Sequence, residues 1–203
     1  MPATQLYLIS PPDVAAAFPQ RLERAIGAGE VAAFQLRVKD VDQHEAARLA
    51  EPLMKICADN DVAFIVNDSI SLAKRLGADG VHLGQQDGTV AEARAALGRE
   101  AQIGVTCHAS RHLAMEAGEA GADYVAFGAF FPSATKPSEH RPEPELLAWW
   151  QALMEIPCAA IGGITPQNCL PLVEAGADFL AVNGAVWSGD EAETVRTFSK
   201  LLK

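Results

Sequence analysis

The chain has 203 residues, of which 49% are hydrophobic and only 6% aromatic. A single hydrophobic core can serve a chain of this length, so we expect one domain over residues 1–203. The formal net charge of −10 works against binding to nucleic acid or an anionic membrane, because that binding depends on Lys and Arg. The N-terminal apolar run is too short for a signal or membrane segment, which indicates a cytoplasmic protein.

Short apolar runs alternate along the chain with stretches of helical periodicity. Leu49–Ile56 and Leu113–Ala117 are examples of the helical stretches. Strict alternation implies a parallel sheet, and eight such units in this length favour closure into a single (β/α)8 TIM barrel of the α/β class. The expected strands are Leu6–Ser10, Ala32–Val38, Ala63–Asn67, Gly80–Gly84, Gln102–His108, Tyr124–Phe130, Cys158–Gly162 and Phe179–Val186.

A repeated tripeptide, Gly-Ala-Asp, marks three junctions between a helical stretch and a strand, at residues 77–79, 121–123 and 176–178. Glycine just after a helix readily adopts positive φ and closes the last turn, so the motif predicts a helix end followed by a buried strand. Side chains suited to N-caps predict helix beginnings at Asp42, Ser110, Thr165–Pro166 and Asp190.

Polar side chains end the second expected strand. In a TIM barrel the functional residues lie at the C-terminal ends of the strands. Period-two alternation would place Gln35, Arg37 and Lys39 on one face, turned inward. A plainer interpretation makes Arg37 and Lys39 solvated residues at a strand end. We favour a binding site, because burying such groups without a partner is costly.

Carboxylates follow the next two strands. Asn67 and Asp68 end the third run, and Asp87 follows the fourth. Mg2+ prefers hard oxygen ligands and commonly takes only one or two protein carboxylates, filling its shell with water and phosphate oxygens. Each Asp alone could instead cap the following helix, but their coincidence with the cations of strand two favours a metal site. His82 is expected to make a core hydrogen bond and is given no catalytic role.

Hydroxyl groups and one further cation follow strands five and six. Thr106 ends the fifth run, and the loop after the sixth contains Ser133, Thr135 and Lys136 within a proline-rich segment. Such residues are ordinary in loops. Their position at the expected C-terminal face makes them candidates for binding an anionic substrate.

Glycines follow strands seven and eight, where barrels often bind phosphate with backbone amides and a helix N-terminus. The residues are Gly162 and Gly163 after strand seven, and Asn183 and Gly184 after strand eight. The alternative is a pair of tight turns. Together with the cationic end, these loops predict two anionic subsites and therefore two phosphorylated small-molecule ligands.

The order of these motifs resembles the thiamine-phosphate synthase and thiazole tautomerase family along essentially the whole chain. The resemblance rests on a series of short motifs, each modest alone. They are Gln35-Leu-Arg-Val-Lys39, Asn67-Asp68, Gly80-Val-His-Leu-Gly-Gln-Gln-Asp87, Ile103-Gly-Val-Thr106, Thr135-Lys136 and Ala160-Ile-Gly-Gly-Ile164.

The resemblance implies a transferase that joins hydroxymethylpyrimidine diphosphate to hydroxyethylthiazole phosphate, giving thiamine phosphate and pyrophosphate with Mg2+. It implies that Asp68 and Asp87 hold the metal and that Gln35 faces the pyrimidine. The Gly163 and Gly184 amides would take the thiazole phosphate. Pyrophosphate would leave before the thiazole nitrogen attacks, so no general base is required. The residues that would hold the diphosphate are Arg37, Lys39, Asn67, Thr106 and Lys136.

Some positions depart from the family pattern and keep alternatives open. Ser69 replaces a usual Arg, Thr106 a usual Ser, and Asn183-Gly184 a typical Val-Ser, while Ser133-Ala134 alter a Thr-rich loop. A non-catalytic paralogue that binds phosphorylated thiamine precursors is one alternative. A thiazole tautomerase is another, although its acid/base His is Ala129 here. A third is a different phosphate-binding barrel enzyme. The sequence leaves a homodimer open.

Overall fold

The computed structural model describes residues 3–39, 41–132 and 140–203. Its strands are β1 Gln5–Ile9, β2 Val31–Leu36, β3 Ala63–Asn67, β4 Gly80–Leu83, β5 Gln102–His108, β6 Tyr124–Gly128, β7 Cys158–Ile161 and β8 Phe179–Val182. Its helices are α1 Phe18–Ile26, α2 Gln43–Asp59, α3 Ile70–Leu76, α4 Val90–Leu97, α5 Arg111–Glu119, α6 Glu145–Leu153, α7 Leu170–Glu174, α8 Gly184–Trp187 and α9 Glu191–Leu201. None of the helices in these ranges is long and apolar enough to cross a membrane.

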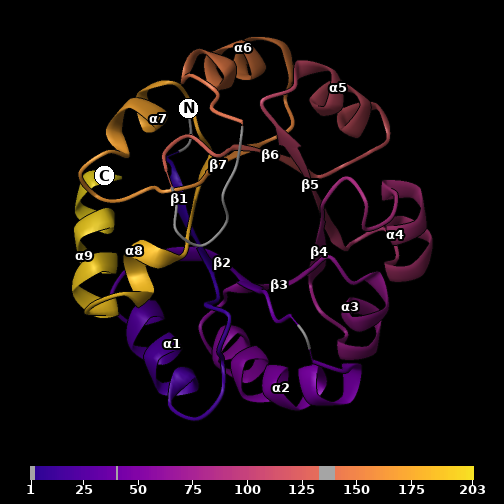
Figure 1. Cartoon of the computed structure of the whole chain (residues 1–203), viewed down its shortest axis with the longest axis vertical. Coiled ribbons are helices and arrows are strands. Elements are labelled where there is room, and N and C mark those ends of the chain that lie inside the picture. Colours follow the sequence, from indigo (N-terminus) through magenta and orange to yellow (C-terminus); the bar gives the residue numbers. More distant parts are fainter. Residues whose placement is uncertain (1–2, 40, 133–139) are drawn as a thin grey trace.

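The strands form one closed parallel barrel in sequence order, β1 to β8. Closure comes from β1, which pairs with β2 on one side and with β8 on the other, where Leu8 lies opposite Val182. Viewed end-on, the barrel is surrounded by a ring of helices (Figure 1). The expected (β/α)8 barrel is therefore confirmed.

Period-two alternation divides the strand residues between two cores. Leu6 and Leu8 point outward into the large core between the barrel and its helices. Tyr7 and Ile9 point into the barrel, where they meet mainly small side chains such as Ala126. The small residues leave room in the barrel interior for the rings of Tyr7 and Tyr124.

The repeated Gly-Ala-Asp junctions hold the strands together at their N-terminal ends. Gly77 takes the left-handed conformation predicted for a helix C-cap, with φ of 64°. Each junction aspartate accepts a hydrogen bond from a backbone N–H of the preceding strand. The pairs are Asp79 with Phe64, Asp123 with Ile103, and Asp178 with Cys158, at 2.7, 2.7 and 2.8 Å.

Three of the four predicted helix beginnings are confirmed, because Asp42, Ser110 and Asp190 cap α2, α5 and α9 with their side chains. The prediction at Thr165–Pro166 is wrong, since α7 begins at Leu170. Asn168 explains the difference. Its Oδ1 accepts a hydrogen bond from the Thr165 N–H at 2.8 Å, which folds residues 165–168 into a turn before the helix.

The eighth strand is shorter than predicted, because it ends at Val182 and Gly184–Trp187 form α8. The Asn183 carbonyl accepts hydrogen bonds from the N–H groups of Val186 and Trp187 at 3.0 and 3.2 Å. A short apolar run does not distinguish a strand from a buried helical turn, which is why the sequence pattern extended the strand.

Candidate functional site

Two carboxylates meet at the C-terminal ends of β3 and β4. Asp68 directly follows β3, and Asp87 lies in the loop after β4. Neither caps a helix, because Ser69 caps α3 and Thr89 caps α4. The plainer interpretation of the two aspartates as N-caps is therefore wrong, and it is Ser69, one of the departures from the family pattern, that has that role.

The electrostatics of Asp68 show that four charged groups converge. Burial raises the pKa of its carboxyl, and the adjacent Asp87 raises it further through its charge and a hydrogen bond. Lys39 and Arg37 act in the opposite direction. Asp68 also has a φ of 65°, a left-handed conformation uncommon for a side chain other than glycine. Like charges and an unusual backbone at one residue are typical of a binding or catalytic site.

The loop that carries Asp87 is shaped to place its carboxylate. Asp87 Oδ2 accepts a hydrogen bond from the Gly84 N–H at 3.0 Å. A Cβ at residue 84 would lie 2.5 Å from the same oxygen, so only glycine allows this approach. Asp68 is tied to β4 as well, because its N–H donates to the His82 carbonyl at 2.8 Å.

The two cations reach Asp68 from a loop and not from a strand. β2 ends at Leu36, so the predicted alternation through Lys39 is wrong beyond Gln35. The Arg37 N–H donates to Ser10 Oγ at 2.8 Å, which ends the pairing of β2 with its neighbours. Arg37 is half-buried and Lys39 exposed, and both side chains act on the Asp68 carboxyl.

A chain of hydrogen bonds crosses the barrel interior beneath these charges. Gln35 Nε2 donates to Tyr7 Oη at 2.9 Å, and the Tyr7 and Tyr124 hydroxyls are 2.9 Å apart. His82 Nδ1 lies 3.0 Å from Tyr124 Oη, and its Nε2 lies 2.8 Å from Thr106 Oγ1. The chain therefore links two predicted site residues, Gln35 for the pyrimidine and Thr106 for the diphosphate.

Sequence reasoning missed both tyrosines of this chain, although it expected the buried hydrogen bond of His82. A signal was available, because Tyr7 and Tyr124 occupy alternate positions within their strands and therefore point inward. A buried Tyr hydroxyl usually has a hydrogen-bond partner. An inward tyrosine on each of two strands was thus a sign of a polar network inside the barrel.

The described residues contain no group of three or more His, Cys, Asp or Glu side chains that could hold a metal ion. The pair formed by Asp68 and Asp87 falls below that size. It matches the smaller protein contribution typical of Mg2+, which completes its coordination with water and phosphate oxygens.

The glycine-rich loop after β7 packs tightly against the segment after β6. Gly162 and Gly163 have φ values of 103° and 63°. A Cβ on Gly162 would lie 2.2 Å from the Ala129 side chain, and one on Gly163 would lie 2.4 Å from the Pro132 carbonyl oxygen. The Phe131 N–H donates to the Gly162 carbonyl at 3.0 Å. Both glycines are therefore required by conformation and by space.

Asn183 and Gly184 follow the end of β8 and have different structural roles. The Asn183 side chain donates from Nδ2 to the Ser10 carbonyl at 2.8 Å, which ties β8 to the segment after β1. Gly184 is the first residue of α8, where backbone N–H groups have no partner earlier in the helix. The predicted residues Ser133, Thr135 and Lys136 lie outside the described residues.

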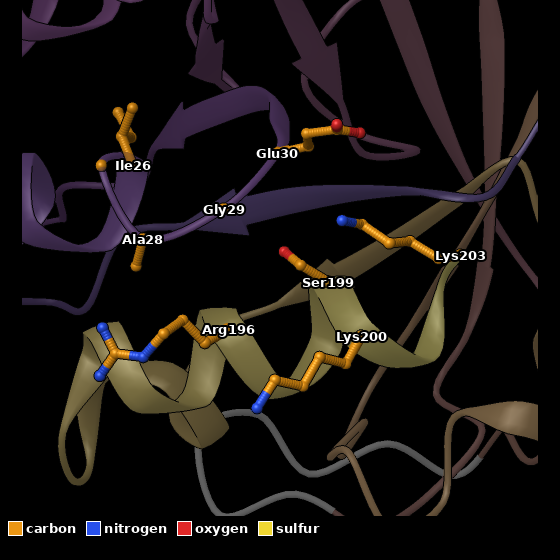
Figure 2. A pocket seen from close by; sticks show the side chains of 9 residues that line it. Ile26, Ala28, Gly29, Glu30, Arg196, Ser199, Lys200 and Lys203 are labelled. Atoms are coloured by element: carbon orange, nitrogen blue, oxygen red, sulfur yellow. The ribbon is translucent and has the colours of Figure 1, made fainter.

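A hollow of about 460 Å³ lies at the opposite end of the barrel (Figure 2). It is formed by Ile26–Glu30, which lead into the N-terminal end of β2, and by the α9 residues Arg196, Ser199 and Lys200 with the terminal Lys203. Figure 2 shows Ser199 directed toward the Gly29 segment. None of the converging charges lies there, so the hollow is separate from the candidate site.

Charged groups at the C-terminal ends of β2 to β4, with a glycine-rich loop after β7 and a helix start after β8, are typical of a phosphate-binding barrel protein. The family model for thiamine monophosphate synthase matches residues 6–186. The chain is 74% identical to the thiamine-phosphate synthase of Erythrobacter litoralis, covering 97% of this chain and 94% of that protein. It is 52% identical to that of Rhodospirillum centenum, covering 98% of each. The chain therefore belongs to the thiamine monophosphate synthase family.

A solved structure supports the same assignment. The thiamine phosphate pyrophosphorylase of Pyrococcus furiosus superposes with a TM-score of 0.86 at 27% sequence identity, over 98% of this chain and 95% of that one. The predicted family is thus confirmed by sequence and by fold.

Proposed function

We propose that the protein is a Mg2+-dependent thiamine-phosphate synthase, a transferase that joins hydroxymethylpyrimidine diphosphate to hydroxyethylthiazole phosphate. The synthase activity is supported by the family model and by the full-length relatives. The observation that carries the assignment of the site is the convergence of Asp87, Arg37 and Lys39 on the half-buried Asp68.

The cations are suited to the departure of a diphosphate. The bond between the pyrimidine methylene and the diphosphate oxygen breaks with its electron pair on the oxygen. The thiazole nitrogen then donates its lone pair to the methylene carbon. Negative charge therefore grows on the leaving group, where Arg37 and Lys39 would stabilise it. Asn67, Thr106 and Lys136 would contribute further donors to the same group, and no proton transfer is needed.

The carboxylate pair fits a divalent metal. Asp68 and Asp87 lie close enough for the charge of Asp87 to raise the Asp68 pKa, and a bound cation would remove that repulsion. Both would serve as ligands for Mg2+, which would supply positive charge to the diphosphate oxygens.

The thiazole phosphate would bind across the barrel mouth. The amides of Gly163 and Gly184 are proposed to hold it, with Gly162 shaping the loop. Asn183 would act there through its hydrogen bond to the Ser10 carbonyl, which fixes the start of α8. Gln35 is proposed to face the pyrimidine, and Ser133 and Thr135 are proposed as further substrate-binding residues.

The test mixes the purified protein with both substrates and Mg2+ and measures thiamine phosphate by thiochrome fluorescence. Asp87→Asn removes the charge but keeps an oxygen that can accept from Gly84 N–H, and it should lower turnover about 100- to 1000-fold. Asp59→Asn alters an exposed carboxylate paired with Lys55 and should leave turnover unchanged. A folded wild type that binds the pyrimidine diphosphate without forming product would favour the non-catalytic paralogue.

The proposal treats residues 1–203 as one domain that acts in the cytoplasm on small phosphorylated substrates, with no nucleic acid or membrane partner. A homodimer stays a prediction that sedimentation equilibrium would test.

A further inference from the structure

Three buried side chains between Gln35 and Thr106 have no part in the proposed chemistry. Tyr7, Tyr124 and His82 are all buried, with 3%, 7% and 6% of their surface exposed. They come from β1, β6 and β4, and no two of these strands are neighbours in the barrel. Polar groups are costly to bury unless they are hydrogen-bonded, so their arrangement calls for a specific explanation.

The barrel makes room for the contact between His82 of β4 and Tyr124 of β6. β5 lies between β4 and β6, and its Gly104 is in register with His82 on one side and Tyr124 on the other. A Cβ on Gly104 would lie 2.0 Å from the Tyr124 ring. Because that side chain is missing, the His82 and Tyr124 rings stack, with centroids 5.5 Å apart and an interplanar angle of 29°.

One direction of the hydrogen-bond chain gives the hydrogen of each tyrosine hydroxyl a partner within the chain. Gln35 Nε2 can only donate, so the Tyr7 hydroxyl accepts from it, and in this direction the Tyr7 hydrogen is directed to the Tyr124 hydroxyl 2.9 Å away. In the same direction Tyr124 would donate to His82 Nδ1, which lies 3.0 Å from its hydroxyl oxygen. An accepting Nδ1 leaves the ring proton of neutral histidine on Nε2, which donates to Thr106 Oγ1. The Thr106 hydroxyl then accepts from His82, and its own hydrogen is available for another acceptor.

We propose that Tyr7, Tyr124 and His82 form a relay of positioning residues that fixes both substrate-facing ends at once. At one end the Gln35 carbonyl oxygen Oε1 is turned toward the pyrimidine as an acceptor. At the other end the Thr106 hydroxyl is set as a donor to a diphosphate oxygen. The relay extends the proposed function and depends on it, because the pyrimidine and the diphosphate are identified only through that function.

The tyrosines keep the protons that the relay needs. Burial raises the pKa of Tyr7 to about 12, and burial together with Tyr7 raises the pKa of Tyr124 well above its ordinary value. Each hydroxyl therefore remains a donor at neutral pH.

The first test measures the His82 tautomer by 15N NMR on histidine-labelled, ligand-free protein. The chain has five histidines, and the signal lost in His82→Gln assigns the one of interest. The expected wild-type result is a neutral ring protonated on Nε2. Tyr124→Phe should abolish that preference, because it removes the donor to Nδ1 while keeping the ring. Protonation of Nδ1 in the wild type would reverse the chain and overturn the proposal.

The second test uses a double-mutant cycle with the synthase assay. Tyr124→Phe and Thr106→Val should each lower kcat about tenfold with a smaller change in KM, and the double variant should lose no more than either alone. Thr106→Ser keeps the hydroxyl and should retain activity. Phe179→Leu alters a ring that packs against both tyrosines and makes no hydrogen bond in the chain, so it controls for packing.

The two tests separate the relay from the proposed function. Absence of product from the wild type would overturn the function, whereas the NMR result does not depend on turnover. Additive losses in the cycle, or a loss in Phe179→Leu equal to that in Tyr124→Phe, would overturn the relay in an active enzyme.

Discussion

The ionised carboxylate of Asp68 is disfavoured in the folded protein without bound cations. Its raised pKa means that the folded protein resists ionisation of this carboxyl more than the unfolded chain does. Its contribution to stability is therefore present at acid pH and is lost as the pH rises through the folded-state pKa. Above the folded-state pKa, Asp68 therefore lowers the free energy of unfolding, which is a common cost of a functional site.

We predict that Asp68→Asn stabilises the metal-free protein at neutral pH and lowers synthase activity at least about 100-fold. Asparagine tolerates the left-handed backbone of residue 68 and carries no charge next to Asp87. A gain of about 1 kcal/mol would raise the melting temperature by about 2–4 °C in a chain of this size. Calorimetry at neutral pH without divalent cations measures it. A lower melting temperature would show that Lys39 and Arg37 already outweigh the repulsion.

At this scale the sequence predicted the types of charged residue but not all of their roles. Asp68 and Asp87 could be predicted because each follows an apolar run, and strand ends meet at one face of a barrel. The tie from Asn183 to the Ser10 carbonyl could not, because its partner lies 173 positions away. Long-range side-chain pairs leave no periodic trace in a single sequence.

The first and last long helices are joined by a buried carboxylate. Glu191, at the start of α9, is 4% exposed and accepts hydrogen bonds from Arg21 and Arg24 of α1. Burial alone would raise the pKa of Glu191, but the two arginines outweigh it and lower the pKa below its ordinary value. A lowered pKa contributes stability at neutral pH that is lost as the pH falls through the folded-state pKa.

We predict that Glu191→Gln lowers the free energy of unfolding by about 1–3 kcal/mol at pH 7. The difference from wild type should shrink as the carboxyl becomes protonated, so urea unfolding at pH 7 and at progressively lower pH measures it. Glu193→Gln is the matched control, because its pair with Arg196 is exposed and worth at most about 1 kcal/mol. A deficit that is independent of pH would contradict the role assigned to the charge.

The junction aspartates support strand ends far from the chemistry. Asp178 accepts from the Cys158 N–H and from Gln151 Nε2, at 2.8 and 2.6 Å. We predict that Asp178→Ala destabilises the protein by about 1–3 kcal/mol, because a backbone N–H and a side-chain amide lose their acceptor. Its KM values should stay at the wild-type level. Denaturant unfolding and steady-state kinetics on the same preparation measure both, with Asp59→Ala as an exposed control. A selective change in KM would contradict a purely structural role.

At the element scale the sequence predicted every strand and misjudged some of their ends. β3 and β5 have the predicted bounds, whereas β2 stops at Leu36 and β8 at Val182. The end of β2 is set by a contact across the barrel mouth, Arg37 N–H with Ser10 Oγ, and the end of β8 by the helical turn of α8. Period-two patterns continue past such contacts and do not record where the backbone leaves the sheet.

The two ends of the barrel divide stability from binding. Junction aspartates and the hollow beside Gly29 and Ser199 lie at the N-terminal ends of the strands. The carboxylates, cations and glycine loops lie at the C-terminal ends, as is general for this fold. Substitutions at the first end should therefore change the unfolding free energy alone, and those at the second should change ligand binding.

The last prediction concerns the whole molecule, because a ligand that binds only the folded state shifts its unfolding equilibrium. At ten times its Kd, Mg2+ would stabilise the wild type by about 1.4 kcal/mol, since the gain is RT ln(1 + [L]/Kd). That corresponds to a rise of about 3–6 °C in melting temperature for a chain of this size. Asp87→Asn should abolish the rise and Asp59→Asn should keep it. An equal rise in Asp87→Asn would place the metal elsewhere and leave the carboxylate pair without its proposed ligand.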